Sequence, residues 1–179
     1  MANTGFHACG TAANVAGTGS DWSSPTNAQA RDVTNLATSA IPAFGATDYL
    51  RCTNFGLSAD VPDGATIDGI IVRINRKASL ADILLDSDLK LWNGSTVIGD
   101  NKASATLYPT SLTDKDYGTA SDKWGATLTA TLIRSSTFGV QLLVINLDEA
   151  STRTASVDVV EMCVYYTEAP TFIPWAIIM

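Results

Sequence analysis

The stretch IDGIIVRINRKA, residues 67–78, decides the fold class of this chain. Aliphatic side chains recur at Ile70, Val72 and Ile74, with polar side chains interleaved. Successive side chains of an extended strand point to opposite faces, so a period of two gathers the aliphatic residues on one face. The stretch therefore predicts a long β-strand with one face in an apolar core.

A second long strand is predicted near the end of the chain, in VDVVEMCVYYT at residues 157–167. Both of its faces are largely apolar toward its end, which is typical of a central strand covered on one side by a second sheet. Similar patterns predict further strands in DYLRCTNFGLS (48–58), ILLDSDLKLW (83–92) and TFGVQLLVINL (137–147).

Turn sequences rather than helices separate these strands. Asn93-Gly94 lies between two apolar runs and predicts a tight hairpin. Only residues 26–40 and 126–135 have a composition that would allow a short helix. Strands without alternating helices predict an all-β fold, a two-sheet antiparallel sandwich that is jelly-roll-like; a closed barrel is the alternative.

The predicted sandwich domain covers residues 47–168 and is flanked by two segments of different composition. Residues 1–46 are rich in Ala, Gly, Ser, Thr and Asn, which turn easily and bury little surface. We interpret them as an extended N-terminal arm with apolar anchors such as Phe6 and Trp22, with a disordered tail as the alternative. Residues 169–179 form an apolar C-terminal tail.

The charge of the chain argues against several kinds of partner. Of its 179 residues only 11 are Lys or Arg, spread thinly, and the net charge is −7. Without a basic stripe we expect no nucleic-acid binding and no attraction to an anionic membrane surface. No apolar stretch approaches the roughly 18 residues of a membrane span, and the N-terminus lacks the pattern of a signal peptide.

The residue types that carry enzyme chemistry are scarce, so we expect no catalytic residue. His7 is the single histidine and lies in the predicted arm, which leaves no His-based triad or multi-histidine zinc site on the strands. We also expect no metal and no cofactor, although one Ca²⁺ in an acidic turn is an alternative to a solvated turn. The acidic clusters concerned are Asp82, Asp86 and Asp88, and Asp114, Asp116 and Asp122.

The three cysteines, Cys9, Cys52 and Cys163, show no metal-binding spacing. We predict buried free thiols in a reducing compartment. A Cys52–Cys163 disulfide remains open, because it requires only that their strands be neighbours.

Several aromatic side chains are candidates for stacking on sugar rings, since exposed aromatics on a β-sandwich are a common carbohydrate-binding design. The alternative is that Trp92 and Trp124 fill the space between the sheets or its rim. The ligand-binding hypothesis assigns Trp92, Trp124 and Tyr108.

The order of several motifs resembles a β-sandwich that recurs in structural proteins of tailed phages and prophages. The motifs are DWSSPTNA (21–28), YLRCTNFGLSADVPDGATIDGIIVRINRKA (49–78), DLKLWNGSTVIGDNKA (88–103), DKWGATLTATLIRSSTFGVQLLV (122–144) and VDVVEMCVYY (157–166). The resemblance covers residues 20–167. It implies a virion protein made in the host cytoplasm, either a capsid decoration (cement) protein or a tail or fibre component. It brings no catalytic residues.

The C-terminal tail, PTFIPWAIIM at residues 170–179, is not part of this resemblance. Each of its large apolar side chains would contribute on the order of 1.5–3 kcal/mol if fully buried, before entropy is counted. We expect the tail to dock into a groove on an adjacent subunit or on the capsid shell; packing on its own domain and membrane contact are the alternatives. The expected contact residues are Phe172, Ile173, Trp175, Ile177 and Ile178, with Phe6 and Trp22 in the arm.

The sequence therefore favours a non-enzymatic phage virion structural protein, first of all a decoration protein that stabilises the head lattice. Its expected partners are the major capsid protein and further copies of the chain, as a homotrimer at a lattice three-fold axis. The alternatives are a carbohydrate-binding or receptor-binding module of a phage tail or fibre, and a glycan-cleaving enzyme.

Overall fold

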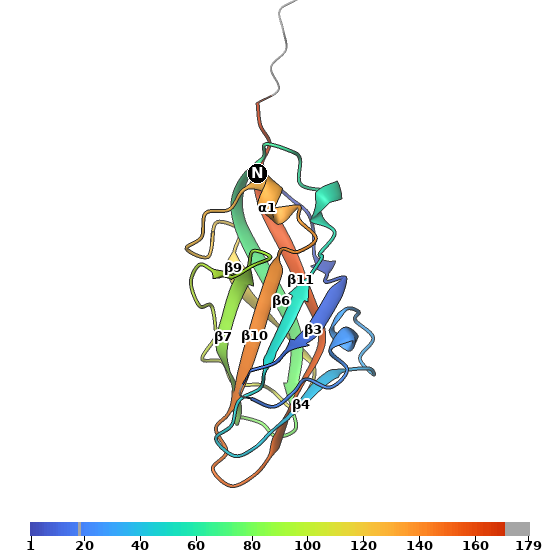
Figure 1. Ribbon diagram of the computed structural model, residues 1–179, viewed down its shortest axis with the longest axis vertical. Helices are drawn as coiled ribbons and strands as arrows, with labels where there is room; N and C mark the ends of the chain where they lie inside the picture. Colours follow the sequence, from blue (N-terminus) through green and yellow to red (C-terminus); the bar gives the residue numbers. More distant parts are fainter. Residues whose placement is uncertain (18, 171–179) are drawn as a thin grey trace, which may run out of the picture.

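The computed structural model describes residues 1–17 and 19–170 as an elongated two-sheet β-sandwich (Figure 1). The predicted residues 67–78 lie in β6 (Thr66–Ala78), which pairs along most of its length with β11 (Arg153–Thr167). The side chains of Ile70, Val72 and Ile74 are fully buried. The alternation in the sequence therefore marks the core face of the sandwich, as predicted.

Both sheets are antiparallel, and the long strands are divided between them. The six-stranded sheet has the order β1-β11-β6-β9, with β2 and β4 also paired to β11, and the five-stranded sheet has the order β3-β5-β10-β7-β8. The remaining bounds are β1 (Ala2–Asn3), β2 (His7–Ala8), β3 (Thr11–Val15), β4 (Ala37–Ile41), β5 (Tyr49–Thr53), β7 (Leu84–Trp92), β8 (Val97–Ile98), β9 (Thr113–Thr119) and β10 (Gly139–Asn146).

Successive long strands alternate between the sheets, because β5, β7 and β10 lie in one sheet and β6, β9 and β11 in the other. This alternation is the connectivity of a jelly roll, in which the chain repeatedly crosses between two layers. The predicted two-sheet antiparallel sandwich is confirmed, and its two open sheets replace the alternative of a closed barrel.

The predicted N-terminal arm is wrong as an extended segment. Within residues 1–46, β1, β2 and β4 add to one edge of β11, while β3 pairs with β5 in the opposite sheet. The segment hides its role in the sequence because strands of two to five residues are too short to show alternation. Small side chains such as Ala12, Ala28 and Ala37 nevertheless fill buried positions there.

The remaining local predictions concern turns and short helices. Asn93 caps the turn between β7 and β8, because its Oδ1 accepts hydrogen bonds from the backbone N–H groups of Ser95 and Thr96. The predicted stretch 126–135 contains α1 (Ala130–Ile133). The stretch 26–40 only overlaps the 3₁₀ turn η1 (Pro25–Ala28) and ends in strand β4, so a helix there is wrong; a second 3₁₀ turn, η2, covers Leu57–Ala59. Thr129 begins α1 by accepting from Leu132 N–H, as an N-cap residue does.

Candidate functional site

Two of the three aromatic side chains predicted to bind sugar are part of the core. Tyr108 and Trp124 are fully buried. The Trp124 indole N–H donates to the carbonyl oxygen of Ile70 at 3.0 Å, which satisfies its polar atom inside the sandwich. Neither ring presents a face to a ligand, so their assignment as ligand-binding residues is wrong.

Tyr108 belongs to a buried polar network that closes one side edge of the sandwich. Asp86 accepts hydrogen bonds from Arg76 Nη1 at 2.5 Å, from the Tyr108 hydroxyl at 2.9 Å and from the Tyr117 hydroxyl at 2.7 Å. The Arg76 guanidinium also lies 3.9 Å from the centre of the Tyr108 ring and donates to the Thr106 carbonyl oxygen. Asp86 was expected in a solvated acidic turn, and that expectation is wrong.

The surroundings of this network shift the pKa of each partner. Burial, followed by the negative charge of Asp86, raises the pKa of Tyr108 well above its ordinary value. Burial, followed by the interactions with Tyr108 and then with Asp86, raises the pKa of Tyr117. Burial alone would lower the pKa of Arg76, but Tyr108, Tyr117 and Asp86 together raise it. Both hydroxyls therefore stay protonated and Arg76 stays charged at neutral pH, so the network holds the fold rather than transferring protons.

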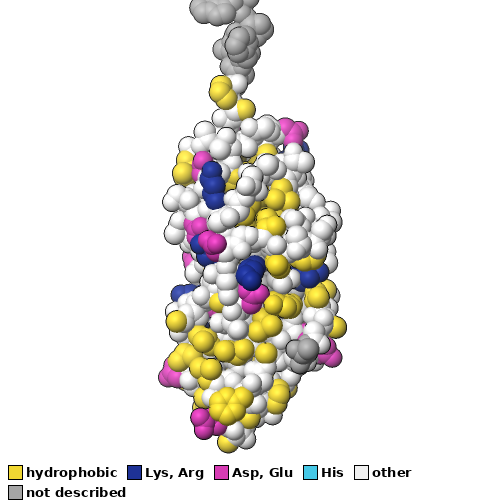
Figure 2. Space-filling view, turned by 60° about the vertical axis from the view of Figure 1, so that its left-hand side comes forward, with side chains coloured by type: hydrophobic (Ala, Val, Ile, Leu, Met, Phe, Trp, Pro, Cys, Tyr) yellow, Lys and Arg dark blue, Asp and Glu magenta, His cyan; other side chains and the backbone are white. Residues whose placement is uncertain are grey.

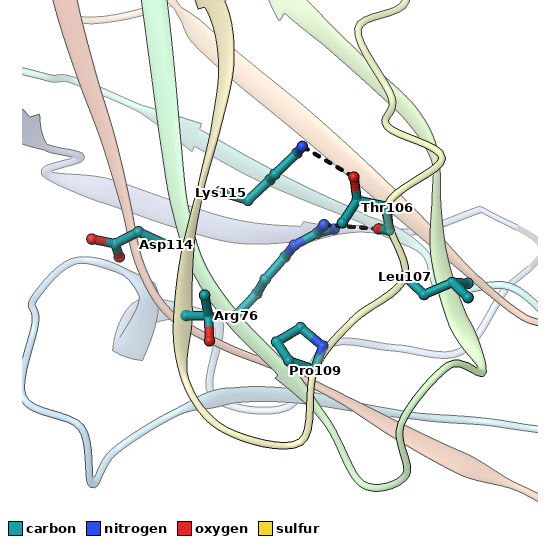
Figure 3. A pocket seen from close by; sticks show the side chains of 7 residues that line it. Arg76, Thr106, Leu107, Pro109, Asp114 and Lys115 are labelled. Atoms are coloured by element: carbon teal, nitrogen blue, oxygen red, sulfur yellow. Dashed lines mark hydrogen bonds between the residues drawn. The ribbon is translucent and has the colours of Figure 1, made fainter.

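A pocket of about 230 Å³ lies over this network, between β9 and the segment that contains Thr106 and Pro109 (Figure 3). Lys115 reaches across it and donates to the Thr106 hydroxyl at 3.2 Å. Arg76 forms part of its wall, but the guanidinium is already bonded to Asp86 and to the Thr106 carbonyl. The polar groups around the pocket therefore hydrogen-bond with one another. Donors without a partner in the described part of the chain lie instead on the outer face of the five-stranded sheet.

Trp92 is the one predicted ligand-binding residue that reaches the surface. It is half-buried at the end of β7, opposite Gly139 of β10. A Cβ atom on Gly139 would lie 2.0 Å from the carbonyl oxygen of Cys52, so only glycine allows this close approach of strands. The large indole lies opposite this side-chain-free position, which gives Trp92 a structural role as well as an exposed one.

Arg51 of β5 lies over Trp92, with its guanidinium carbon 3.6 Å from the ring centre. Its Nε and Nη2 atoms both donate to Gln141 Oε1, at 3.3 and 3.1 Å. We call Arg51, Trp92 and Gln141 the Arg51 patch. No property of Arg51 or Gln141 in the sequence singles them out; only the register of β5, β10 and β7 brings the three side chains together.

A second exposed feature is apolar and lies at the end of the sandwich where three loops meet. Phe44, Leu80 and Leu147 project there with 68%, 44% and 42% of their surface exposed, and we call them the apolar tip. Figure 2 shows hydrophobic side chains gathered over this lower end of the molecule.

Backbone hydrogen bonds join the three loops of the tip. Phe44 N–H donates to the Asp148 carbonyl, Leu147 N–H to the Ile83 carbonyl, and Ser79 N–H to the Thr154 carbonyl. The Phe44 backbone has φ 53°, a left-handed conformation that a non-glycine residue adopts at a cost of about 1–2 kcal/mol. The fold thus holds Phe44 in a strained and exposed position that its own core does not require.

The predicted arm contacts differ from one another. Trp22 is buried, and its indole N–H donates to the Asp48 carbonyl at 2.9 Å, so its assignment as a partner contact is wrong. Phe6 is 37% exposed and lies on the Arg73 guanidinium at 3.9 Å. The predicted tail contacts Phe172, Ile173, Trp175, Ile177 and Ile178 lie outside the described residues.

The cysteine prediction is confirmed for the thiols themselves. Cys9, Cys52 and Cys163 are buried and free, and the strands of Cys52 and Cys163 belong to different sheets, so the alternative disulfide is not formed. The pKa of the Cys52 thiol is raised well above its ordinary value by its hydrogen bond with Cys9 and by burial. A thiol held protonated in this way is a weak nucleophile.

Across residues 1–17 and 19–170, no three His, Cys, Asp or Glu side chains gather as a metal site would require. In the same part of the chain, every helix is too short or too polar to cross a bilayer.

Comparison with known proteins shows no family for this chain. No protein-family model matches the chain, and no curated protein matches it. Among solved structures it is similar to the N-terminal cellulose-binding domain of β-1,4-glucanase C from Cellulomonas fimi. The identity is 15% and the TM-score 0.39, over 94% of this chain and 91% of that one. The ligand named for that domain is a property of that domain, so a site in this chain has to be argued from its own residues.

Proposed function

We propose that this chain is a non-enzymatic structural protein of a phage virion, a capsid decoration protein that docks on the major capsid protein through its apolar tip. The observation that carries the proposal is the exposure of Phe44, Leu80 and Leu147 on loops that are hydrogen-bonded to one another. A preorganised apolar surface loses little conformational entropy when a partner covers it, which favours binding.

The strain at Phe44 supports the same proposal. A left-handed phenylalanine in solvent is unfavourable for the isolated molecule, both in backbone energy and in exposed apolar surface. A partner that buries the ring would offset the strain with on the order of 1.5–3 kcal/mol per apolar side chain. Repetition of that contact over a symmetric lattice multiplies a modest contribution from each copy.

The C-terminal tail is the second predicted contact with the shell. Thr167 to Pro170 are exposed at the end of the sandwich opposite the apolar tip (Figure 1). From the sequence of residues 171–179, we propose that this segment docks on a neighbouring subunit or on the shell. The apolar tip and the C-terminal segment would then bind the capsid lattice at opposite ends of the sandwich.

The experiment measures copies of the protein bound per empty capsid of the virus that encodes the chain. The test variants are the triple change Phe44→Ser, Leu80→Ser and Leu147→Ser, and a truncation after Pro170. Val33→Ser is the matched control, because Val33 is also left-handed and 62% exposed but lies outside the tip. We expect saturation at a fixed copy number for the native chain and the control, and loss of binding for both test variants. Saturation by the triple variant would overturn the tip contact.

A further inference from the structure

The outer face of the five-stranded sheet carries an arginine whose charge has no partner. Within residues 1–17 and 19–170, no carboxylate lies within ion-pair distance of Arg51. Its Nε and Nη2 atoms are bonded to Gln141, whereas no protein atom in that range accepts from Nη1. Arg51 is therefore a half-buried cation that retains free donors in a chain of net charge −7.

The strand register leaves space next to these donors. Arg51 lies between Gln141 of β10 on one side and Ala13 of β3 on the other. Ala13 is exposed and carries only a methyl group, so it does not cover the guanidinium. Lys90, which faces Gln141 from β7, lies 3.3 Å from Asp88 and is thereby neutralised. The unpaired positive charge of this face is concentrated at Arg51.

The stack of Arg51 on Trp92 fixes the direction of the guanidinium. A planar guanidinium that rests on an indole and donates twice to Gln141 loses little further freedom when an anion binds. Guanidinium donors match the two oxygens of a carboxylate, and the part of the indole that the guanidinium leaves uncovered offers an apolar contact beside them. Both features suit one ligand, a ring that bears a carboxylate.

We propose that the Arg51 patch binds an acidic polysaccharide through a uronic-acid unit, whose carboxylate accepts from Arg51 while its ring contacts the part of Trp92 that the guanidinium leaves uncovered. The patch lies flat on the sheet rather than in a pocket, so a chain of sugars can extend past it across the strands. This site is independent of the proposed capsid contact, because the apolar tip lies on the loops at the end of the sandwich and the patch lies on its face.

The first test is a titration of the full chain with alginate oligosaccharides, with neutral cello-oligosaccharides as the control ligand. The readout is the indole N–H resonance of Trp92, assigned by its loss in Trp92→Phe. Trp22 and Trp124 are buried and serve as internal references. We expect a saturable shift of the Trp92 resonance with alginate alone, weakened by added salt because the contact is ionic.

The second test compares two arginines that each lie on an aromatic ring. Arg51→Gln should weaken alginate binding by about tenfold or more, the usual range for a lost charge-assisted hydrogen bond. Arg73→Gln is the matched control, since Arg73 lies on Phe6 but is bonded to Asp116, and it should leave the affinity unchanged. The fold of each variant is checked by its thermal transition; Trp92→Ala supplies a second variant and should also reduce affinity.

Three results would overturn the proposal. One is the absence of any Trp92 shift with alginate. Another is equal binding of cello-oligosaccharides, which would show that the carboxylate is not recognised. The last is equal loss of affinity in Arg51→Gln and Arg73→Gln, which would show attraction to general charge rather than to the patch.

Discussion

The outer faces of the two sheets each carry an arginine stacked on an aromatic ring, yet the two arrangements differ in one respect. On the six-stranded sheet, Arg73 lies on Phe6 and donates from Nε and Nη2 to both carboxylate oxygens of Asp116, at 2.7 and 2.8 Å. On the five-stranded sheet, Arg51 lies on Trp92 and has only the neutral Gln141. The first arginine is satisfied by the protein and the second retains capacity for a ligand.

A third arginine combines an aromatic ring and a carboxylate in the same way, but in the core of the protein. Arg76 lies on Tyr108 as the others lie on their rings, but its carboxylate partner Asp86 is in the core. Burial makes each member of the pair indispensable to the other, because a lone charge in the interior is far more costly than one at the surface. The environment of an arginine, not its aromatic neighbour, therefore decides whether it stabilises the fold or remains available for a ligand.

The largest expected effect tests the buried arginine. Asp86→Ala leaves the Arg76 charge and two tyrosine hydroxyls without their acceptor, so we expect a loss of about 3–5 kcal/mol in the free energy of unfolding. Urea denaturation measures it. Asp116→Ala removes the corresponding carboxylate from Arg73 at the surface and serves as the control; losses of equal size would contradict the distinction between the two sites.

A smaller effect is expected from the two exposed rings. Trp92→Ala exposes the gap over Gly139 and removes a half-buried indole, so we expect a loss of about 2 kcal/mol. Phe6→Ala removes a more exposed ring from Arg73 and should cost only about 0.5–1 kcal/mol. Thermal unfolding of both variants checks this order. A larger loss for Phe6→Ala would mean that the N-terminal strands depend on the Phe6 contact.

The surface ion pair itself should contribute less. Asp116→Asn keeps the shape of the side chain and removes its charge, and we expect a change of about 0.2–1 kcal/mol that shrinks as salt is added. Denaturation at low and high ionic strength measures both quantities. A salt-independent loss would indicate that hydrogen-bond geometry, rather than charge, holds Arg73.

The smallest effect concerns the loss of folding stability at low pH. Asp114 accepts hydrogen bonds from Asn75 and Arg31, which lower its pKa despite the opposing effect of burial. A carboxyl with a lower pKa in the folded state adds stability above its unfolded pKa of about 3.9, and that stability is lost as pH falls through the folded pKa. Because Asp114 is exposed, the contribution is about 0.5 kcal/mol or less. Asp114→Asn should flatten the acid limb of stability below about pH 4; an unchanged limb would contradict this assignment.

The success of the sequence-based predictions followed the length of the strands. Alternation over β6 and β11 is long enough to reveal both the strands and their core faces. The N-terminal strands β1 to β4 contain only two to five residues each, so composition suggested a loose arm where the chain in fact builds sheet edges. Tertiary pairing with β11 and β5, which no local pattern encodes, decided their structure.

The sequence contains a signal for part of the buried network. Arg76 is in phase with Ile70, Val72 and Ile74, which places it on the core face of β6 rather than among the outward polar residues. Likewise Asp86 is in phase with Leu84 on β7. However, Asp86 also has the parity of the outward Asp88 and Lys90, because the register shifts between Asp86 and Asp88, so the sequence marks the core position of Arg76 more clearly than that of Asp86. By contrast, the Arg51 patch has no such signature, because its outward residues are ordinary for a strand.

The pairing of β1 with β11 has a consequence for how the protein forms. Ala2 lies opposite Tyr166, so β1 cannot pair before the chain as far as Tyr166 has left the ribosome. Contacts between such distant residues slow folding, since the intervening chain must be closed into a loop before any gain is realised. Once β11 has formed, and until β1, β2 and β4 dock on it, its free edge is an open template for a second chain, and nascent copies made side by side risk exchanging their first strands.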